Sequence, residues 1–385
     1  MTSRMPIGRS ARLVGALLCA SLLAVVGLFA QSTLASTNAR TAVAFGGAPS
    51  LHVSGRGLFT AHGRRVVLHG VNFPGAEFLC AKGRGIWDGP VDQASVTAMR
   101  SWHVNAVRVP LNEDCWNGEP YLKLRYRGVV YQRAVAAYVQ LLNRNGLVAI
   151  LDLHRSDGRY AGPGAHCKTT VKAFCMKPMP DAAHAIPFWI SVARTFKTNN
   201  AVIFDAFNEP FPNRAPGATE AEAWQCWQLG GNCTGIGYQV AGMQSLVTAI
   251  RSTGARNVIM LPGLVYANDL SGWLAHEPRD PDHNIAASWH IYPWNPCAGR
   301  PCWNSQVAPV IARVPVVVGE FGETNCADNR INPLMRWLDL RGTGYLAWAW
   351  NATWTCTVGP SLIRSWAGAP TLYGAGYRQH LLSLR

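Results

Sequence analysis

Short apolar runs alternate with amphipathic segments through most of the chain. The runs are rich in Val, Ile, Leu and Ala, which is typical of parallel strands covered on both faces. The predicted strands are Val67–Asn72, Ala106–Val109, Val148–His154, Val202–Asn208, Asn257–Leu261, Ala287–Tyr292, Val316–Glu320 and Tyr345–Asn351. The predicted helices between them are Val91–Trp102, Tyr131–Asn145, Ala182–Lys197, Gly237–Ser252 and Asn332–Leu340.

Eight strands in alternation with helices predict the α/β class and a (β/α)8 TIM barrel. A small hairpin is predicted at Leu51–Gly70, where Gly-rich segments supply the turns. No internal repeat or long low-complexity linker follows the hairpin. Residues 51–385 are therefore expected to form a single domain.

Polar side chains stand at or near the carboxyl ends of these predicted strands. In a (β/α)8 barrel all such ends meet at one rim, where active sites are built. Residues that are far apart in sequence would therefore converge on one cleft. The side chains concerned are Arg108, His154, Asn208, Glu209, His290, Tyr292, Glu320 and Trp350.

The first 35 residues have the features of a signal peptide. Three arginines precede an uncharged apolar run at residues 13–30, and small residues follow at Ser32–Ala35. The pattern predicts cleavage, with residues 36–50 as a short linker, and thus a secreted, extracellular protein without stable membrane insertion. A retained membrane anchor is the alternative, because the run is near the lower length limit for a span.

The cysteines support export. Cys19 lies in the leader, and the other ten are an even number, which indicates disulfides in an exported chain. Their irregular spacing, without a Cys-x-x-Cys pair, disfavours zinc, so no metal or cofactor is expected. The favoured pairs are Cys80–Cys115, Cys167–Cys175, Cys226–Cys233, Cys297–Cys302 and Cys326–Cys356.

The chain is basic, with a formal net charge of +14. Such a charge is compatible with nucleic acid, anionic surfaces or acidic glycans as partners. The Lys and Arg residues are scattered, however, and no basic run occurs. A solvated cationic surface is the preferred interpretation, with no nucleic-acid partner, and nothing in the sequence requires more than a monomer.

Two glutamates, Glu209 and Glu320, end apolar runs on the predicted fourth and seventh strands. Hydrolysis of a glycosidic bond needs a proton donor together with either a nucleophile or an activated water, and two carboxyl groups meet that need. A lone glutamate is more often a structural ion-pair partner. The pair on one rim favours catalysis. Glu323 competes for the nucleophile role but lies beyond its strand.

Five motifs in this order resemble glycoside hydrolase family 5 over roughly residues 50–385. They are Val107-Arg108-Val109-Pro110, Leu151-Asp152-Leu153-His154, Asn208-Glu209-Pro210, His290-Ile291-Tyr292 and Gly319-Glu320-Phe321-Gly322. The resemblance implies a barrel in which Glu209 is the acid/base and Glu320 the nucleophile of a retaining double displacement on a β-linked polysaccharide or oligosaccharide.

The resemblance also implies roles for neighbouring residues. Arg108 would hydrogen-bond Glu320 and keep it ionised, although a barrel-interior ion pair would also explain an arginine there. Asn208 would bind the sugar 2-hydroxyl, a contact that strengthens in the transition state. Tyr292 would orient Glu320.

Two histidines and a tryptophan complete the expected site. His154 would contact sugar hydroxyls, with a satisfied core histidine as the alternative, and His290 would lie near Glu209. Trp350 would form the apolar platform beneath a sugar ring. Other tryptophans in predicted rim segments are candidates for the cleft or for loop packing, namely Trp116, Trp227, Trp289, Trp294, Trp303 and Trp354.

The sequence leaves the sugar open. An endo-β-1,4-glucanase, as in cellulases, is the favoured activity, and β-mannanase, β-1,3-glucanase and β-glycosidase activities on the same machinery are alternatives. A non-catalytic carbohydrate-binding barrel is disfavoured because both glutamates are present. One departure from the family pattern is Arg155-Ser156-Asp157 after His154, where relatives often have an aromatic residue.

Overall fold

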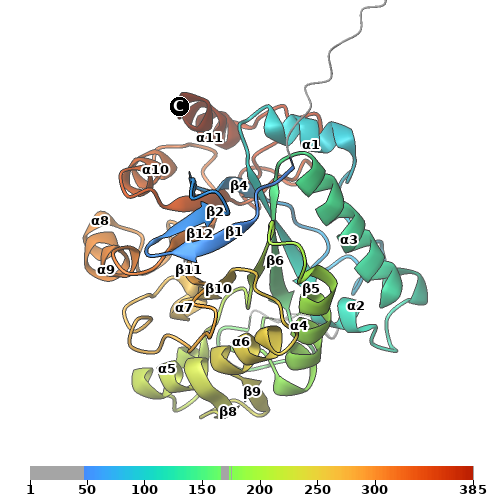
Figure 1. Ribbon diagram of the computed structural model, residues 1–385, viewed down its shortest axis with the longest axis vertical. Coiled ribbons are helices and arrows are strands. Elements are labelled where there is room, and N and C mark those ends of the chain that lie inside the picture. Colours follow the sequence, from blue (N-terminus) through green and yellow to red (C-terminus); the bar gives the residue numbers. More distant parts are fainter. Residues whose placement is uncertain (1–46, 166–172, 175, 385) are drawn as a thin grey trace, which may run out of the picture. The chain divides into compact units, whose positions relative to one another are not determined.

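The computed structural model describes residues 47–165, 173, 174 and 176–384 (Figure 1). The predicted leader and the Cys167–Cys175 pair lie outside these residues. No helix of the described residues is long and apolar enough to cross a bilayer.

Within the described residues, eight parallel strands close into a barrel, so the predicted TIM barrel is confirmed. Each strand pairs with the next, and the last pairs with the first. The strands are β4 (His69–Asn72), β5 (Ala106–Asn112), β6 (Val148–Arg155), β7 (Val202–Asp205), β10 (Ile259–Pro262), β11 (Ile285–Ile291), β12 (Val316–Phe321) and β13 (Gly344–Ala347).

Helices surround the barrel strands (Figure 1). Several begin at side-chain caps, which satisfy free backbone N–H groups. Asp92 caps the first helix by accepting from Ser95 N, and Thr219 and Glu222 form a reciprocal capping box. The helices are α1 (Gln93–Arg100), α2 (Glu113–Asn117), α3 (Val129–Arg144), α4 (Ala182–Phe196), α5 (Glu220–Leu229), α6 (Met243–Arg251), α7 (Leu264–Ala267), α8 (Arg300–Cys302), α9 (Ala308–Ile311), α10 (Ile331–Asp339) and α11 (Leu372–Ser383).

The predicted hairpin at Leu51–Gly70 is a three-stranded antiparallel sheet that overlaps the first barrel strand. It consists of β1 (Leu51–Ser54), β2 (Gly57–Thr60) and β3 (Arg65–Val66). Leu51 and Leu58 pack in one apolar cluster with the first residues of the barrel strands. The sheet therefore covers the amino-terminal end of the barrel.

The prediction of one helix over Gly237–Ser252 is partly wrong. Its first part is strand β9 (Gln239–Ala241), which pairs with β8 (Gly230–Asn232), and α6 begins only at Met243. The pairing brings the two backbones close together, since a Cβ on Gly230 would lie 2.3 Å from Val240 O. The tertiary contact overrides the local helical pattern.

Four of the favoured disulfides are confirmed in the described part of the chain. They are Cys80–Cys115, Cys226–Cys233, Cys297–Cys302 and Cys326–Cys356. The last bond links the segment after β12 to the segment after β13. Several loops at the carboxyl ends of the strands are thus held covalently.

Removing a disulfide should cost more stability when it closes a longer ring. Replacing both cysteines of Cys326–Cys356, 30 residues apart, should lower the free energy of unfolding by about 3–4 kcal/mol. The same change at Cys297–Cys302, five residues apart, should cost about 2 kcal/mol. Denaturant titration without reductant measures both values. A larger loss for the shorter ring would contradict the chain-entropy explanation.

Candidate active site

Strand alternation places polar groups inside the barrel above an apolar layer. Ala106 and Ile150 belong to the apolar cluster of the lower barrel. Side chains two residues further along a strand point to the same face. Arg108 and Asp152 therefore follow them on the inside, and Asp205 is placed in the same way on β7.

Arg108 is fully buried and binds three carboxyl groups at once. Its Nε lies 2.9 Å from Asp205 Oδ2, its Nη2 3.0 Å from Asp152 Oδ2, and its Nη1 2.7 Å from Glu320 Oε1. Nη1 and Nη2 also donate to the side-chain oxygens of Asn72 and Asn208, at 3.1 and 2.9 Å. One guanidinium thus joins five barrel segments.

One positive charge cannot neutralise three carboxylates. Burial raises the pKa of Asp152 to about 7 and that of Asp205 to about 8, although Arg108 lowers both. Burial by itself would lower the pKa of Arg108, but the carboxylates raise it above its ordinary value. Near neutral pH the aspartates are therefore partly protonated, which reduces the excess negative charge around Arg108. Arg108 stays charged beside Glu320.

A β-bulge directs Glu320 into the barrel. Trp289 pairs with Val318, but the next residue of β11, His290, pairs with Glu320, so Gly319 is the extra residue. A Cβ at Gly319 would lie 2.8 Å from His290 Nε2 and 2.9 Å from Ser288 Oγ. Only glycine fits there, and the bulge turns the following side chain toward Arg108.

Glu320 is held from a second side by Tyr292. The phenol donates to Glu320 Oε2 at 2.8 Å, and Arg108 donates to Oε1. Burial and the negative charge of Glu320 raise the pKa of Tyr292 well above its ordinary value, so the phenol keeps its proton. Both oxygens of Glu320 therefore have fixed donors, as expected from the sequence.

Glu209 follows β7 and faces His290. The strand ends at Asp205, three residues before its predicted end at Asn208, so Asn208 and Glu209 lie in the loop that follows it. His290 Nδ1 is 3.1 Å from Glu209 Oε1. Burial lowers the pKa of His290 to about 3, so the ring is neutral and carries one proton. One oxygen of Glu209 lies within 4.8 Å of one oxygen of Glu320.

The platform prediction for Trp350 is wrong. Trp350 is fully buried and packs edge-on against Trp102, with ring centroids 4.9 Å apart, so it cannot reach a sugar. Trp348 lines the cavity that contains Glu209 and stacks on His154 at 5.7 Å. Because β13 ends at Ala347, strand alternation does not decide which tryptophan faces the cleft.

His154 is buried beside the cleft. Its Nδ1 lies 2.7 Å from Asp152 Oδ2, which links the ring to the Arg108 network, and burial lowers its pKa well below the ordinary value. The ring is thus neutral. Its contact with Trp348 places it beside the cavity wall.

The cavity beside Glu209 has a volume of about 580 Å³. Trp294 is 61% exposed and stacks on Tyr292 with ring centroids 4.8 Å apart, and both line the cavity. Trp354 stacks on Trp348. The other candidate tryptophans, Trp116, Trp227, Trp289 and Trp303, are buried.

Glu323, the competitor for the nucleophile role, has a structural function. It is fully buried, and its Oε1 accepts from the backbone N–H groups of Arg330 and Ile331 at 2.6 and 2.7 Å. These N–H groups begin α10, where a carboxylate is favoured by the helix dipole. Glu323 therefore caps α10.

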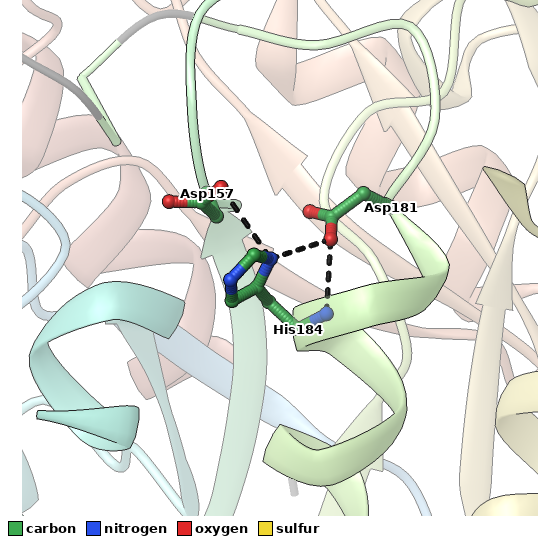
Figure 2. A group of neighbouring side chains, drawn as sticks. All are labelled: Asp157, Asp181 and His184. Atoms are coloured by element: carbon green, nitrogen blue, oxygen red, sulfur yellow. Dashed lines mark hydrogen bonds and ion pairs between the residues drawn. The ribbon is translucent and has the colours of Figure 1, made fainter. Parts of the chain in front are cut away.

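A second group of acids and histidine lies between the segment after β6 and the start of α4. The His184 ring faces Asp157 and Asp181 (Figure 2). Its Nδ1 lies 2.8 Å from Asp181 Oδ1 and 3.4 Å from Asp157 Oδ2. Lys177 Nζ lies 3.1 Å from Asp181 Oδ2. Burial lowers the pKa of His184, but the hydrogen bond to Asp181 and both acids outweigh burial and raise it. The cationic groups neutralise these acids, so an ion-pair network explains the cluster.

The space around Gly319 gives a structural prediction. Gly319→Ala should displace the His290 ring and lower the free energy of unfolding by about 1–3 kcal/mol, because the barrel interior has no room for a methyl group. Gly237→Ala is the control, since nothing lies within 4 Å of a Cβ there. Denaturant titration and NMR of the His290 ring measure the two effects. Equal stability of the two variants would refute the proposed crowding.

Comparison with known proteins agrees with this geometry. Residues 60–353 match the family described as cellulase (glycosyl hydrolase family 5). A mannan endo-1,4-β-mannosidase from Salipaludibacillus agaradhaerens is 21% identical over 82% of this chain and 86% of its own length. Another, from Cellvibrio japonicus, is 22% identical over 78% of this chain and 59% of its own length.

Solved structures share the fold. A β-glucanase from Saccharophagus degradans has a TM-score of 0.65 and 18% identity, with 88% of this chain and 94% of that one covered. A β-mannanase from Thermomonospora fusca has a TM-score of 0.61 and 16% identity, with 88% and 98% covered. The resemblance seen in the sequence is confirmed by the family match. The chain belongs to glycosyl hydrolase family 5.

Proposed function

We propose that this protein hydrolyses a β-1,4-linked glycan with retention of anomeric configuration, through a covalent intermediate on Glu320. The observation that carries the proposal is the proximity of the two glutamates, with carboxylate oxygens within 4.8 Å of each other. Retaining enzymes have carboxyl groups about 5–5.5 Å apart, whereas inverting enzymes leave about 6.5–9.5 Å for a water.

Glu320 attacks the anomeric carbon while Glu209 protonates the leaving oxygen. Arg108 and Tyr292 hold the two oxygens of Glu320 by hydrogen bonds of 2.7 and 2.8 Å, which fixes the attacking group before the substrate arrives. In the second step Glu209 takes a proton from a water molecule, whose oxygen bonds to the anomeric carbon as the bond between the sugar and Glu320 breaks. Neutral His290 supports Glu209 in both steps by its Nδ1 contact.

Trp348 offers an apolar face for a sugar ring in the cavity that contains Glu209. A glucan is the preferred backbone, and the activity is then that of an endo-β-1,4-glucanase. A β-mannanase is the second candidate, because both curated relatives described above are mannan endo-1,4-β-mannosidases. Structures of relatives have been solved with cellotetraose and with mannotriose.

We also propose that the protein acts outside the cell. The sequence has the features of a leader, and disulfides persist in oxidising compartments.

Replacing each glutamate separates the two steps. Glu320→Ala should lower kcat by about 10⁴-fold or more on every β-glycan it cleaves. Glu209→Ala should lower kcat on polymers by about 10²–10⁴-fold. It should still hydrolyse aryl glycosides with good leaving groups, because these need little protonation. Azide should then restore turnover of the glycosyl-enzyme. Glu220→Ala, exposed on α5, is the control.

Product stereochemistry is an independent readout of the same assignment. NMR of the first product from a β-linked substrate should show the β anomer. If the α anomer forms first, or if Glu209→Ala loses all substrates equally, the assigned roles are wrong.

Activity should survive chelation. Glu209, His290 and Glu320 are close enough to share an ion. Arg108 and Tyr292 already occupy both oxygens of Glu320, however, and a cation beside Arg108 would be repelled. Dialysis against EDTA should therefore leave kcat/KM within about twofold, since no step needs a Lewis acid. A loss that added zinc or calcium reverses would show that the cluster is a metal centre.

A further inference from the structure

Arg214 lies on the wall of the cavity that contains Glu209. It ends a short 3-10 helix, Pro212–Arg214, and shares the wall with Val265, Tyr266 and Trp294. The guanidinium takes part in none of the ion pairs and side-chain hydrogen bonds found among the described residues. Arg214 is exposed, so its positive charge is accessible to a ligand in the cavity.

The wall beside Arg214 is held in an unusual backbone conformation. Val265, Tyr266 and Ala267 have φ values of 54, 59 and 60°, the left-handed region that disfavours side chains with a Cβ. Non-glycine residues persist there only when their surroundings impose it, and such positions cluster at ligand sites.

Hydrogen bonds from two neighbouring loops hold this turn. Tyr266 N donates to Pro210 O at 2.9 Å, directly after Glu209, and Tyr266 Oη donates to Gly164 O at 3.1 Å. Its ring stacks on Phe211 at 4.9 Å. The wall that carries Arg214 is therefore rigid and tied to the position of the acid/base.

A second arginine points to the same chemistry. Arg155 ends β6, directly after His154, and also takes part in none of the ion pairs of the described chain. Its charge interacts with Glu77, Glu209 and Glu320. Both arginines therefore contribute positive potential near the glutamates.

We infer that this cavity is a subsite for a sugar unit that carries a carboxylate, and that Arg214 binds the carboxylate. The inference rests on the proposed hydrolytic function and narrows its substrate to acidic β-glycans. A guanidinium matches a carboxylate with two parallel N–H···O bonds, which a neutral hydroxyl cannot accept as strongly. Because Glu209 lies in the same cavity, the subsite adjoins the bond that is cleaved.

Paired substrates with one backbone test the inference. Carboxymethyl cellulose is compared with hydroxyethyl cellulose, and carboxymethyl galactomannan with native galactomannan, so that either backbone is covered. Arg214→Gln should lower kcat/KM on the carboxymethylated partner about tenfold at low salt and change the neutral partner less than twofold. Arg214→Lys should retain only part of the preference, because the ammonium group keeps the charge but not the two parallel N–H donors. Salt at 0.5 M should reduce the wild-type preference for the carboxymethylated polymers, because it screens the attraction between the guanidinium and the carboxylates.

Arg56→Gln is the charge-matched control, because Arg56 is exposed in the β1–β2 turn at the amino-terminal end of the barrel. It should leave the ratio of kcat/KM on the carboxymethylated polymer to kcat/KM on the neutral polymer unchanged for both backbones. Equal losses on charged and neutral partners, or an unchanged ratio in Arg214→Gln, would overturn the inference.

A binding measurement separates this inference from the hydrolytic proposal. Tryptophan fluorescence of Glu320→Gln reports the affinity for the same four polymers without turnover. Adding Arg214→Gln to this variant should abolish the preference for binding the carboxymethylated polymers. If the wild type binds with this preference but cleaves none of the four polymers, only the hydrolytic proposal is wrong. If the preference persists in the double variant, Arg214 is not the anion-binding residue.

Discussion

The site depends on one buried guanidinium. Arg108, on β5, donates to groups on or just beyond four other barrel strands, including Asp152, Asp205 and Glu320, and it is fully removed from solvent. A buried charge is tolerated only when it is paired and its donors are satisfied. The need to pair this one buried charge therefore sets the positions of the carboxyl groups around it, including the orientation of Glu320.

Much of this arrangement follows from the sequence by alternation. Near-continuous apolar runs predict the eight strands, and their polar ends predict the rim that carries Arg108, Glu209 and Glu320. The same period of two would also have found Asp152 and Asp205, which lie two residues beyond Ile150 and Ile203 on the barrel interior. Both lie within the predicted strands, away from the strand ends at which the other polar side chains of the site stand.

Other features depend on contacts that no local pattern encodes. The bulge at Gly319 shifts pairing with both neighbouring strands, so simple alternation cannot state which way Glu320 points. Trp348 and Trp350 lie two residues apart beyond the end of β13, so alternation would place both on the same face. Only the packing of Trp350 against Trp102 distinguishes the buried tryptophan from the one that lines the cavity. The left-handed turn at Val265–Ala267 contains no glycine, so the sequence does not predict it. Each feature borders the cleft, where tertiary structure overrides local preference.

In the proposed mechanism Glu320, held by Arg108 and Tyr292, becomes covalently attached to the sugar. A 2-deoxy-2-fluoro β-glycoside with a good leaving group slows release of such an intermediate, so the adduct accumulates. Mass spectrometry of the digested protein should then find one sugar on the peptide that contains Glu320. An adduct on Glu209 or Glu323, or complete turnover of a cleavable substrate without any adduct, would contradict the account.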